Sequence, residues 1–273
     1  QGSLIRAMRL SKPEEIYNLA SQSFVAHSFE APIHTGDVTG LGALRVFEAA
    51  RLTCPHARIY QASSSEQFGN SSTTWQNEET PFNPVSPYGC AKTFAHFCAV
   101  MYRQSSKLFI ACGIAFNHES PRRGKEFVTQ KIAQGVAAIH RGDCATLTLG
   151  NLEARRDWSH ARDIMEAAWK MLQQEIPSDY VLASGESHSV KEFVQQACRV
   201  AGLTISDNLF NRVIKIDPTL YRPTDISNMV GNIEKAKSVL DWTLTITFNQ
   251  LVEEMVHAAL DQTEPYNTLR TTR

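Results

Sequence analysis

The chain alternates short apolar segments with longer amphipathic ones over most of its length. Runs rich in apolar, β-branched and aromatic residues have the length of buried strands and occupy residues 15–20, 57–63, 108–117 and 179–184. Stretches with the apolar spacing of a helix lie at residues 38–52, 88–105, 126–141 and 164–174. This alternation predicts an α/β fold, in which helices cover both faces of a parallel sheet.

The last third of the chain has a different character. Ser189, followed three residues later by Glu192, is a capping-box pattern that predicts a helix continuing to residue 200. From about residue 203 the segments become short, until a final helical pattern at residues 248–260. No repeat, low-complexity block or long linker interrupts the sequence, so we expect one domain over residues 1–273.

Composition narrows the possible partners. The net charge is -1, with 42% hydrophobic and 20% charged residues, which gives no electrostatic reason to expect nucleic acid or an anionic membrane as a partner. No apolar run reaches the roughly 18 residues of a membrane span, and the first residues do not resemble a secretion signal. We therefore expect a soluble protein in the cytoplasm.

Cysteines and histidines show no metal-binding spacing. The six cysteines are scattered and form no CxxC pair, so we expect buried, reduced thiols. The nine histidines include no HExxH pattern, and we expect no metal site.

The stretch SPYGCAK places Tyr88 four residues before Lys92, at the start of a predicted helix. Residues i and i+4 share one helix face, and an ammonium near a phenol favours the phenolate. Lys92 is therefore expected to lower the pKa of Tyr88 and make it a usable base. The alternative for any single YxxxK is a packed tyrosine beside a solvated lysine.

A glycine-rich phosphate-binding turn is the feature that the sequence lacks. A dinucleotide-binding fold normally begins with a strand and such a turn, because only glycine lets the backbone approach the pyrophosphate. Gly40 and Gly42 form the one GxG pattern, but they lie inside a helical pattern with no preceding strand. We interpret them as a site of close helix packing.

Several separate stretches carry a family resemblance. They are YNLASQS from residue 17, YQASSSEQFG from 60, SPYGCAK from 86, FNHESPRRGKEFVTQKI from 116, LGNLEARRDW from 149 and YRPTD from 221. Together they resemble the GDP-mannose 4,6-dehydratases, a family of the extended short-chain dehydrogenase/reductase superfamily, over nearly the whole chain. Relative to that family, roughly the first 80 residues are missing, including the Gly-rich turn.

The resemblance implies a fold and an activity. The fold would be a doubly wound, Rossmann-like parallel sheet, N-terminally incomplete, with a smaller C-terminal substrate-binding lobe. Residues from 1 to about 118 would form a partial dinucleotide-binding core, and those from about 119 to 273 a mixed core and lobe. The enzyme would be a hydro-lyase using NADP, with NAD still open, to oxidise C4 of GDP-mannose, eliminate water across C5 and C6, and reduce C6. Weak dinucleotide binding is expected of residues 1–273 alone.

By the same resemblance, four residues would carry the chemistry. Tyr88 would take the C4 hydroxyl proton while Lys92 holds the nicotinamide ribose. Glu66 would take the C5 proton and return it to the leaving C6 hydroxyl. Ser64 stands where the family has threonine and keeps the hydroxyl without the methyl group. The alternative for SSSE is a polar turn that caps a helix.

The resemblance also implies binding residues. Those expected to bind the cofactor are Leu19, Ala20, Ser21, Gln22, Ser23, Tyr88, Lys92, His118 and Arg123. Those expected to bind GDP-mannose are Asn117, Val128, Lys131, Gly150, Asn151, Arg156 and Arg222, of which the two arginines would pair with the pyrophosphate. Two positions depart from the family: His34 stands in place of tyrosine and Asn232 in place of aspartate.

Two other functions remain open at this point. A GDP-4-keto-6-deoxymannose reductase or a nucleotide-sugar epimerase would use the same tyrosine and lysine but no C5 base, so Glu66 separates them from a dehydratase. An inactive GDP-sugar-binding or scaffold protein is the alternative of another class. The resemblance further implies a homo-oligomer, either a dimer or a tetramer.

Overall fold

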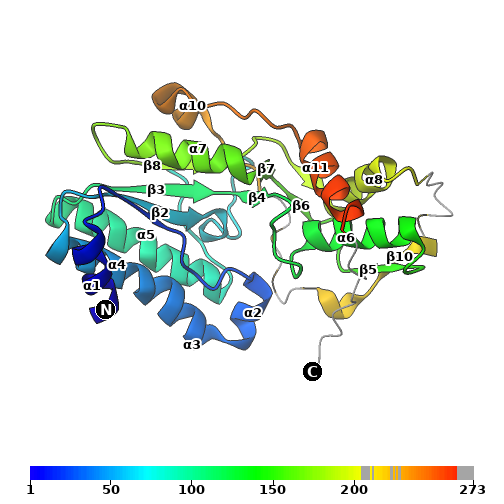
Figure 1. Ribbon diagram of the computed structural model, residues 1–273, viewed down its shortest axis with the longest axis horizontal. Helices are drawn as coiled ribbons and strands as arrows, with labels where there is room; N and C mark the ends of the chain where they lie inside the picture. The colour runs from blue at the N-terminus through cyan, green and yellow to red at the C-terminus, as the bar shows by residue number, and fades with distance from the viewer. Residues whose placement is uncertain (204–209, 211, 222–223, 225, 227–228, 263–273) are drawn as a thin grey trace.

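The central sheet has four parallel strands in the order β1-β2-β3-β8 (Figure 1). The computed structural model describes residues 1–203, 210, 212–221, 224, 226 and 229–262. The strands are β1 (Glu15–Asn18), β2 (Arg58–Ser64), β3 (Ile110–Ala115) and β8 (Asp179–Leu182). Each lies within or overlaps one of the four segments expected from the sequence, and every residue of β3 is buried, as the continuous apolar run predicts.

Helices cover both faces of this sheet, which confirms the doubly wound fold (Figure 1). On one face lie α4 (Gly42–Thr53) and α5 (Pro87–Ser105), which enclose an apolar cluster with Phe47 and Ile110. On the other face lies α7 (Ala161–Leu172), which packs with α10 (Glu234–Leu240) over a second cluster. The carboxyl ends of the parallel strands are left for loops and functional groups.

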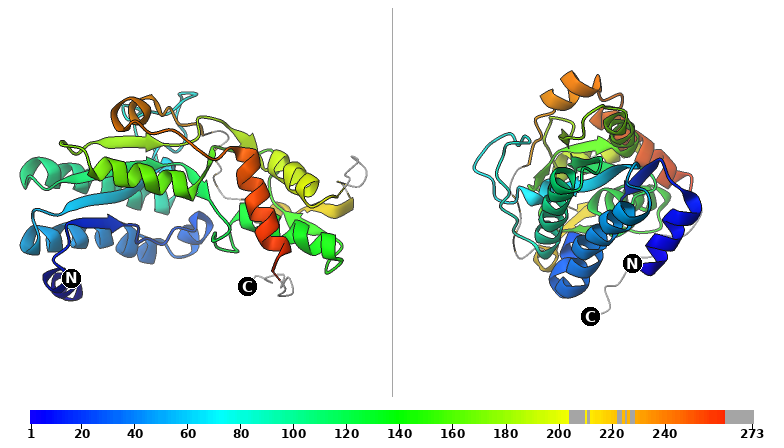
Figure 2. Two further views of the ribbon diagram at one scale, coloured as in Figure 1. Left: turned by 45° about the horizontal axis from the view of Figure 1, so that its top comes forward. Right: turned by 90° about the vertical axis from the view of Figure 1, so that its left-hand side faces the viewer.

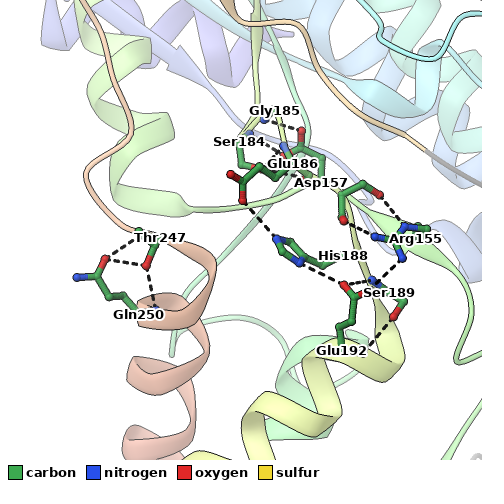
Figure 3. Close-up of polar contacts among 11 residues, drawn as sticks. Arg155, Asp157, Ser184, Gly185, Glu186, His188, Ser189, Glu192, Thr247 and Gln250 are labelled. Atoms are coloured by element: carbon green, nitrogen blue, oxygen red, sulfur yellow. Dashed lines mark hydrogen bonds and ion pairs between the residues drawn. The ribbon is translucent and has the colours of Figure 1, made fainter.

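A second group of elements lies beside the sheet, toward the right of Figure 1. It contains α6 (Val128–Arg141), α8 (Val190–Val200), α11 (Phe248–Leu260) and the parallel pair β5 (Leu147–Leu149) and β10 (Ile214–Ile216). These elements share an apolar cluster of their own. Reciprocal capping boxes begin α8 at Ser189 and α11 at Thr247 (Figure 3), the first of which the sequence predicted. The division near residue 118 remains a prediction.

The remaining elements are short. They are α2 (Val25–Glu30), α3 (Pro32–Thr35), the π-helical η1 (Gly36–Leu41), the 3-10 turns η2 (Ser65–Gln67) and η3 (Pro218–Leu220), and β4 (Asn117–Glu119), β6 (Arg155–Arg156), β7 (Trp158–His160) and β9 (His188–Ser189). Strand β4 pairs in parallel with β7, and β6 pairs antiparallel with β9. Strands β4, β6 and β7 contain residues of the stretches FNHESPRRGKEFVTQKI and LGNLEARRDW, and they lie outside the central sheet.

Gly40 lies in a tight helix contact, as its helical context predicts. A Cβ at this position would lie 3.2 Å from Phe94 Cδ1 and 3.4 Å from the Ala91 carbonyl oxygen, both on α5. The segment continues through η1 into α4 with no strand before it. The interpretation as close packing is therefore confirmed for Gly40, whereas a Cβ on Gly42 would only be in ordinary contact with the Asp37 carbonyl oxygen at 3.6 Å.

Two expectations need correction. Helix α1 (Gly2–Ser11) was not expected, yet it packs on the outer side of α4 through Leu4, Ile5 and Met8 (Figure 2). With ten residues the helix is too short to be stable alone, so it depends on its contact with α4. All six cysteines are free thiols, but only Cys54, Cys112 and Cys198 are buried: Cys98 and Cys144 are half-buried, and Cys90 is exposed near the start of α5. None of the helices in the described ranges is both long and apolar enough to cross a bilayer.

Candidate active site

The end of β2 builds the first part of the site. Ser64 is the last residue of the strand, and its hydroxyl accepts a hydrogen bond from the backbone N–H of Glu66 at 3.3 Å. The side chain of Gln67 in turn accepts from the backbone N–H of Ser64 at 2.7 Å. The capping interpretation of SSSE is thus correct, and it also fixes Ser64 and Glu66 at the carboxyl edge of the sheet.

The start of α5 packs directly against this turn. Ser86 caps the helix by accepting from the N–H of Gly89 at 3.0 Å, and Pro87 occupies the first turn. A Cβ on Gly89 would lie 2.7 Å from the carbonyl oxygen of Glu66, so only glycine allows this approach. The contact brings the buried Tyr88 to Ser64, whose hydroxyl hydrogen-bonds to the phenol.

The electrostatics of Tyr88 differ from the expectation. Its pKa is raised to about 12, chiefly by burial and also by the charge of Glu66, although Ser64 and Arg123 lower it. Lys92 does not lower this pKa: its ammonium donates to the Ala62 carbonyl oxygen at 2.8 Å and lies 5.7 Å from the centre of the Tyr88 ring. Burial lowers the pKa of Lys92 itself to about 8. The predicted lowering by Lys92 is therefore wrong for this chain: burial dominates the pKa of Tyr88, and the Lys92 ammonium is bound to the Ala62 carbonyl oxygen.

His118 and Arg123 follow β3 and lie near the same tyrosine. The Nδ1 atom of His118 is 2.8 Å from the Phe116 carbonyl oxygen, and burial, aided by the charges of Arg123 and Lys92, lowers the pKa of the imidazole. The guanidinium carbon of Arg123 lies 3.5 Å from the centre of the Phe127 ring. Both predicted cofactor-binding residues thus interact electrostatically with the predicted catalytic residues: Arg123 with Tyr88, and His118 with Lys92.

Glu119 is a member of this cluster that the sequence reasoning missed. Its carboxylate is 3.1 Å from Nε of Arg123 and accepts the Thr129 hydroxyl at 2.7 Å. In the stretch NHESPRRG, Glu119 precedes Arg123 by four residues. This spacing marks neighbouring side chains only on a helix, so on a strand and the loop after it the spacing did not predict the pair.

The loop after β1 holds the remaining predicted cofactor residues. Leu19, Ala20 and Ser23 are exposed, and Ser21 is half-buried. Gln22 fixes the loop, because its N–H donates to the Thr39 hydroxyl at 3.1 Å and its amide donates to the Phe24 carbonyl oxygen at 3.1 Å. This loop follows the carboxyl end of β1, which lies at the same edge of the sheet as Ser64 at the end of β2.

The predicted GDP-mannose residues are spread over three elements. Asn117 begins β4 and accepts from the Ser159 hydroxyl through its carbonyl oxygen at 3.4 Å, whereas Val128 begins α6. Burial lowers the pKa of Lys131, and Asp217 opposes this change. Gly150 lies under Leu220, whose carbonyl oxygen would be 3.2 Å from an added Cβ. Asn151 uses its side chain to accept from the N–H of Glu153 at 3.0 Å.

Arg156 is the predicted phosphate-binding residue that the structure describes. Its side chain is buried, and Nη1 donates to the carbonyl oxygens of Arg155 and Ile226 at 2.7 Å each. These contacts orient the guanidinium. Arg222, the second predicted phosphate-binding residue, lies outside the described residues.

Asp157, next to Arg156, is an anchor that the sequence reasoning also missed (Figure 3). Its buried carboxylate accepts from the N–H and the hydroxyl of Ser184, both at 2.6 Å, from Gly185 N–H at 2.9 Å and from Gly231 N–H at 3.1 Å. Burial raises the pKa of Asp157 and these hydrogen bonds lower it. The carboxylate thus connects β6 and β7 with the end of β8 and with the segment before α10.

The two positions that depart from the family lie apart from the tyrosine cluster. His34 is exposed on α3. The backbone N–H of Asn232 donates to the Gln76 carbonyl oxygen at 2.8 Å, and its side chain accepts from the N–H of Glu234 at 3.0 Å. The amide of Asn232 therefore starts α10 in the way an aspartate would.

A cluster of potential metal ligands arises in the fold although no sequence motif indicated one. Side-chain atoms of His96, Cys112 and Asp179 lie within 4.8 Å of one another. The guanidinium of Arg103 is 2.5 Å from an Asp179 oxygen, so this carboxylate already has a cation, and burial raises the pKa of the Cys112 thiol well above its usual value. The absence of a metal remains a prediction.

The sequence comparison decides the family. A family profile described as GDP-mannose 4,6 dehydratase matches residues 1–255. The chain belongs to this family. The GDP-mannose 4,6 dehydratase of Drosophila melanogaster is 43% identical over 95% of this chain and 69% of that protein. The GDP-mannose 4,6 dehydratase of Homo sapiens is 44% identical over 94% of this chain and 73% of that protein.

Solved structures agree on the architecture of this family member. The structure of RMD from Pseudomonas aeruginosa complexed with NADPH has a TM-score of 0.82 and 20% identity, and the match covers 92% of this chain and 82% of that one. At this identity the likeness concerns the fold. The resemblance found in the separate sequence stretches is therefore confirmed, together with the doubly wound sheet.

Proposed function

We propose that the protein is a GDP-mannose 4,6-dehydratase, a hydro-lyase that forms GDP-4-dehydro-6-deoxymannose. The observation that carries this proposal is the meeting of Ser64, Glu66 and Tyr88 where the end of β2 contacts the start of α5. A phenol and a carboxylate held near each other suit a reaction with two separate proton removals.

In this proposal, Tyr88 accepts the proton of the C4 hydroxyl as C4 is oxidised. Ser64 lies within hydrogen-bonding reach of the phenol and stabilises its anion. Glu66, half-buried beside them, removes the C5 proton, which the C4 ketone makes acidic, and then delivers a proton to the departing C6 hydroxyl. Lys92 holds its ammonium at the Ala62 carbonyl oxygen, one helical turn from the tyrosine.

The residues present fit the nicotinamide end of a dinucleotide cofactor. Glu119 lies 3.1 Å from Nε of Arg123, while the Arg123 side chain is 23% exposed, so the other nitrogen atoms of its guanidinium can donate to a further acceptor. His118, Lys92 and the loop at residues 19–23 would complete the binding site. Bound, the cofactor would accept hydride from C4 and return it at C6. We propose NADP, with NAD as the alternative.

For the sugar nucleotide, we assign the diphosphate to Arg156 and Arg222. Arg156 belongs to the RRDW stretch that carries the family resemblance, and its buried guanidinium is oriented by two carbonyl oxygens. The planar fork of a guanidinium matches the oxygens of a phosphate, so a diphosphate is the ligand that it suits. Asn117, Val128, Lys131, Gly150 and Asn151 are proposed to surround the rest of the nucleotide.

Glu66 favours the dehydratase over its alternatives. A reductase or an epimerase needs the tyrosine and the lysine but no carboxylate at C5. Here the charge of Glu66 is close enough to Tyr88 to raise the pKa of the phenol. An inactive GDP-sugar-binding protein would need none of these groups in contact with one another.

We further propose that the protein forms a homo-oligomer. Phe94, Phe97 and Met101 are 44%, 59% and 45% exposed, and they follow one another along the outer face of α5. An apolar stripe of this kind is typical of a surface that a second subunit covers. A dimer or a tetramer is expected, and the cytoplasmic location remains a prediction.

The proposal is tested by product analysis with GDP-mannose and NADP. We expect GDP-4-dehydro-6-deoxymannose from the unaltered protein and at least about a hundredfold slower formation from Glu66→Gln. Glu153→Gln, an exposed glutamate in the nucleotide-binding part, is the matched control and should keep full activity. Epimerised or reduced sugar as the product would replace this function with one of the alternatives.

A further inference from the structure

Glu119 is a buried carboxylate that the proposed reaction does not use. It ends β4, is 2% exposed, and accepts the Thr129 hydroxyl at 2.7 Å. Burial raises its pKa, whereas Arg123 and Thr129 lower it. A buried carboxylate is costly unless a partner compensates it, and here the partner is the guanidinium of Arg123 at 3.1 Å.

Arg123 is held from two sides. Glu119 contacts its Nε, and the ring of Phe127 lies against the guanidinium at 3.5 Å. Phe127 is itself supported by the edge of Phe24, with ring centres 5.5 Å apart. Since the Arg123 side chain is 23% exposed, it has room to turn toward solvent once either contact is lost.

The place of Arg123 matters because of the charges that surround Tyr88. Glu66, from η2, raises the pKa of the phenol, and Ser64, from the end of β2, lowers it by a hydrogen bond. Lys92, on the same helix as Tyr88, has its ammonium 5.7 Å from the ring centre. Arg123, from the segment between β4 and α6, is the cation whose charge lowers the pKa of Tyr88.

We propose that Glu119 is a positioning residue for the reaction: it holds the Arg123 guanidinium beside Tyr88, so that the tyrosine can ionise. The catalytic consequence rests on the proposed function, whereas the link from Glu119 through Arg123 to Tyr88 does not. Glu119 is too enclosed to touch the sugar, and it acts only through the arginine. Its removal should therefore have no further effect once the arginine is absent.

The kinetic test is a double-mutant cycle in the pH profile. Glu119→Gln keeps an oxygen for the Thr129 hydroxyl but loses the charge that holds Arg123. Below the pKa of Tyr88, kcat/KM rises with pH in proportion to the ionised fraction of the phenol. We expect this rising limb to be displaced by about one unit to higher pH, which is about a tenfold lower kcat/KM at a fixed pH, since an opposite charge near a titrating group shifts its pKa by about that much or more. Arg123→Met should produce the same shift, and the double variant no more than Arg123→Met alone. Additive shifts would overturn the proposal.

Two further variants guard against a folding defect. Glu119→Asp keeps the charge but shortens its reach, so a smaller shift in the same direction is expected. Glu126→Gln changes an exposed carboxylate on the same segment and should leave the profile unchanged. An equal shift in Glu126→Gln would mean a general charge effect, which contradicts the proposal.

A second readout needs no turnover. In protein labelled with 3-fluorotyrosine, whose phenols ionise at lower pH, the ¹⁹F signal of Tyr88 is assigned by its loss in Tyr88→Phe. We expect this signal to titrate at higher pH in Glu119→Gln than in the unaltered protein, and at the same pH in Arg123→Met as in the double variant. If this holds while GDP-mannose is not dehydrated, only the proposed function fails. If the Tyr88 titration does not move, the role of Glu119 is disproved whatever the activity.

Discussion

Two parts of the proposed active site are held together in different ways. The catalytic part, Ser64, Glu66, Tyr88 and Lys92, is built from a strand end and a helix start that touch through backbone at Gly89. The phosphate-binding part at Arg156 depends on Asp157, whose carboxylate collects donors from residues 184, 185 and 231. The first part rests on local caps and a close backbone contact, and the second on one buried side chain that connects distant segments.

The largest effect is expected where one side chain carries the contacts. Asp157→Ala would leave the N–H groups of Ser184, Gly185 and Gly231 without their acceptor, at about 1–3 kcal/mol for each buried donor. We expect the free energy of unfolding to fall by about 4 kcal/mol in denaturant titrations. Asp143→Ala, which removes an exposed partner of Arg141, is the control and should cost under about 1 kcal/mol. Equal losses of unfolding free energy in Asp157→Ala and Asp143→Ala would mean that Asp157 does not hold the phosphate-binding part together.

The pH dependence of the free energy of unfolding tests the burial of Lys92 in the catalytic part. Its pKa is about 8 in the folded protein, below the ordinary lysine value of the unfolded chain. Between these two pKa values the unfolded state binds more protons, so this group makes stability rise with pH from about 8 to about 10, by up to about 3 kcal/mol. Urea titrations at both ends of this range should show that rise, and Lys92→Met should lack it. A rise of the same size in the variant would mean that Lys92 is not desolvated.

Gly89→Ala tests the backbone contact itself. The added methyl group would lie 2.7 Å from the Glu66 carbonyl oxygen and force α5 away from η2. We expect a stability loss of about 1–3 kcal/mol from overpacking, with kcat reduced more than GDP-mannose affinity, since Tyr88 and Glu66 would separate. The control is Gly36→Ala, where nothing lies within 4 Å of an added Cβ. A loss of affinity with kcat preserved would place the contact outside the catalytic part.

The smallest effect is expected at Ser64. Ser64→Thr restores the residue typical of the family and keeps the hydroxyl while the methyl group restricts its rotamers. Steady-state kinetics should show a change in kcat of no more than about threefold, because the hydrogen bond to Tyr88 is retained. Ser64→Ala should lose at least about tenfold. If both substitutions have the same effect, the hydroxyl does not act on the tyrosine.

The same contrast explains what the sequence could predict. The four strands, helix α5 and the caps at Ser64 and Ser189 follow from local patterns, and the structure contains them. The roles of Glu119 and Asp157 were not predicted, since their partners lie on other elements and only folding brings them together. The pKa of Tyr88 was predicted in the wrong direction because the spacing to Lys92 says nothing of burial. Local signals thus indicate which residues are involved, whereas tertiary contacts set their electrostatics.

Solvent deuterium at C5 of the product reports directly on proton removal by Glu66. We assign removal of the C5 proton to Glu66, beside Tyr88 and Ser64. With GDP-mannose and NADP in D₂O, the unaltered protein should form GDP-4-dehydro-6-deoxymannose with one solvent deuteron at C5 and none in the methyl group, whose third hydrogen is the hydride from C4. Glu66→Gln should bind GDP-mannose as before, yet show neither product nor exchange at C5. Exchange and turnover in Glu66→Gln within about threefold of the unaltered protein would mean that Glu66 is not the base at C5.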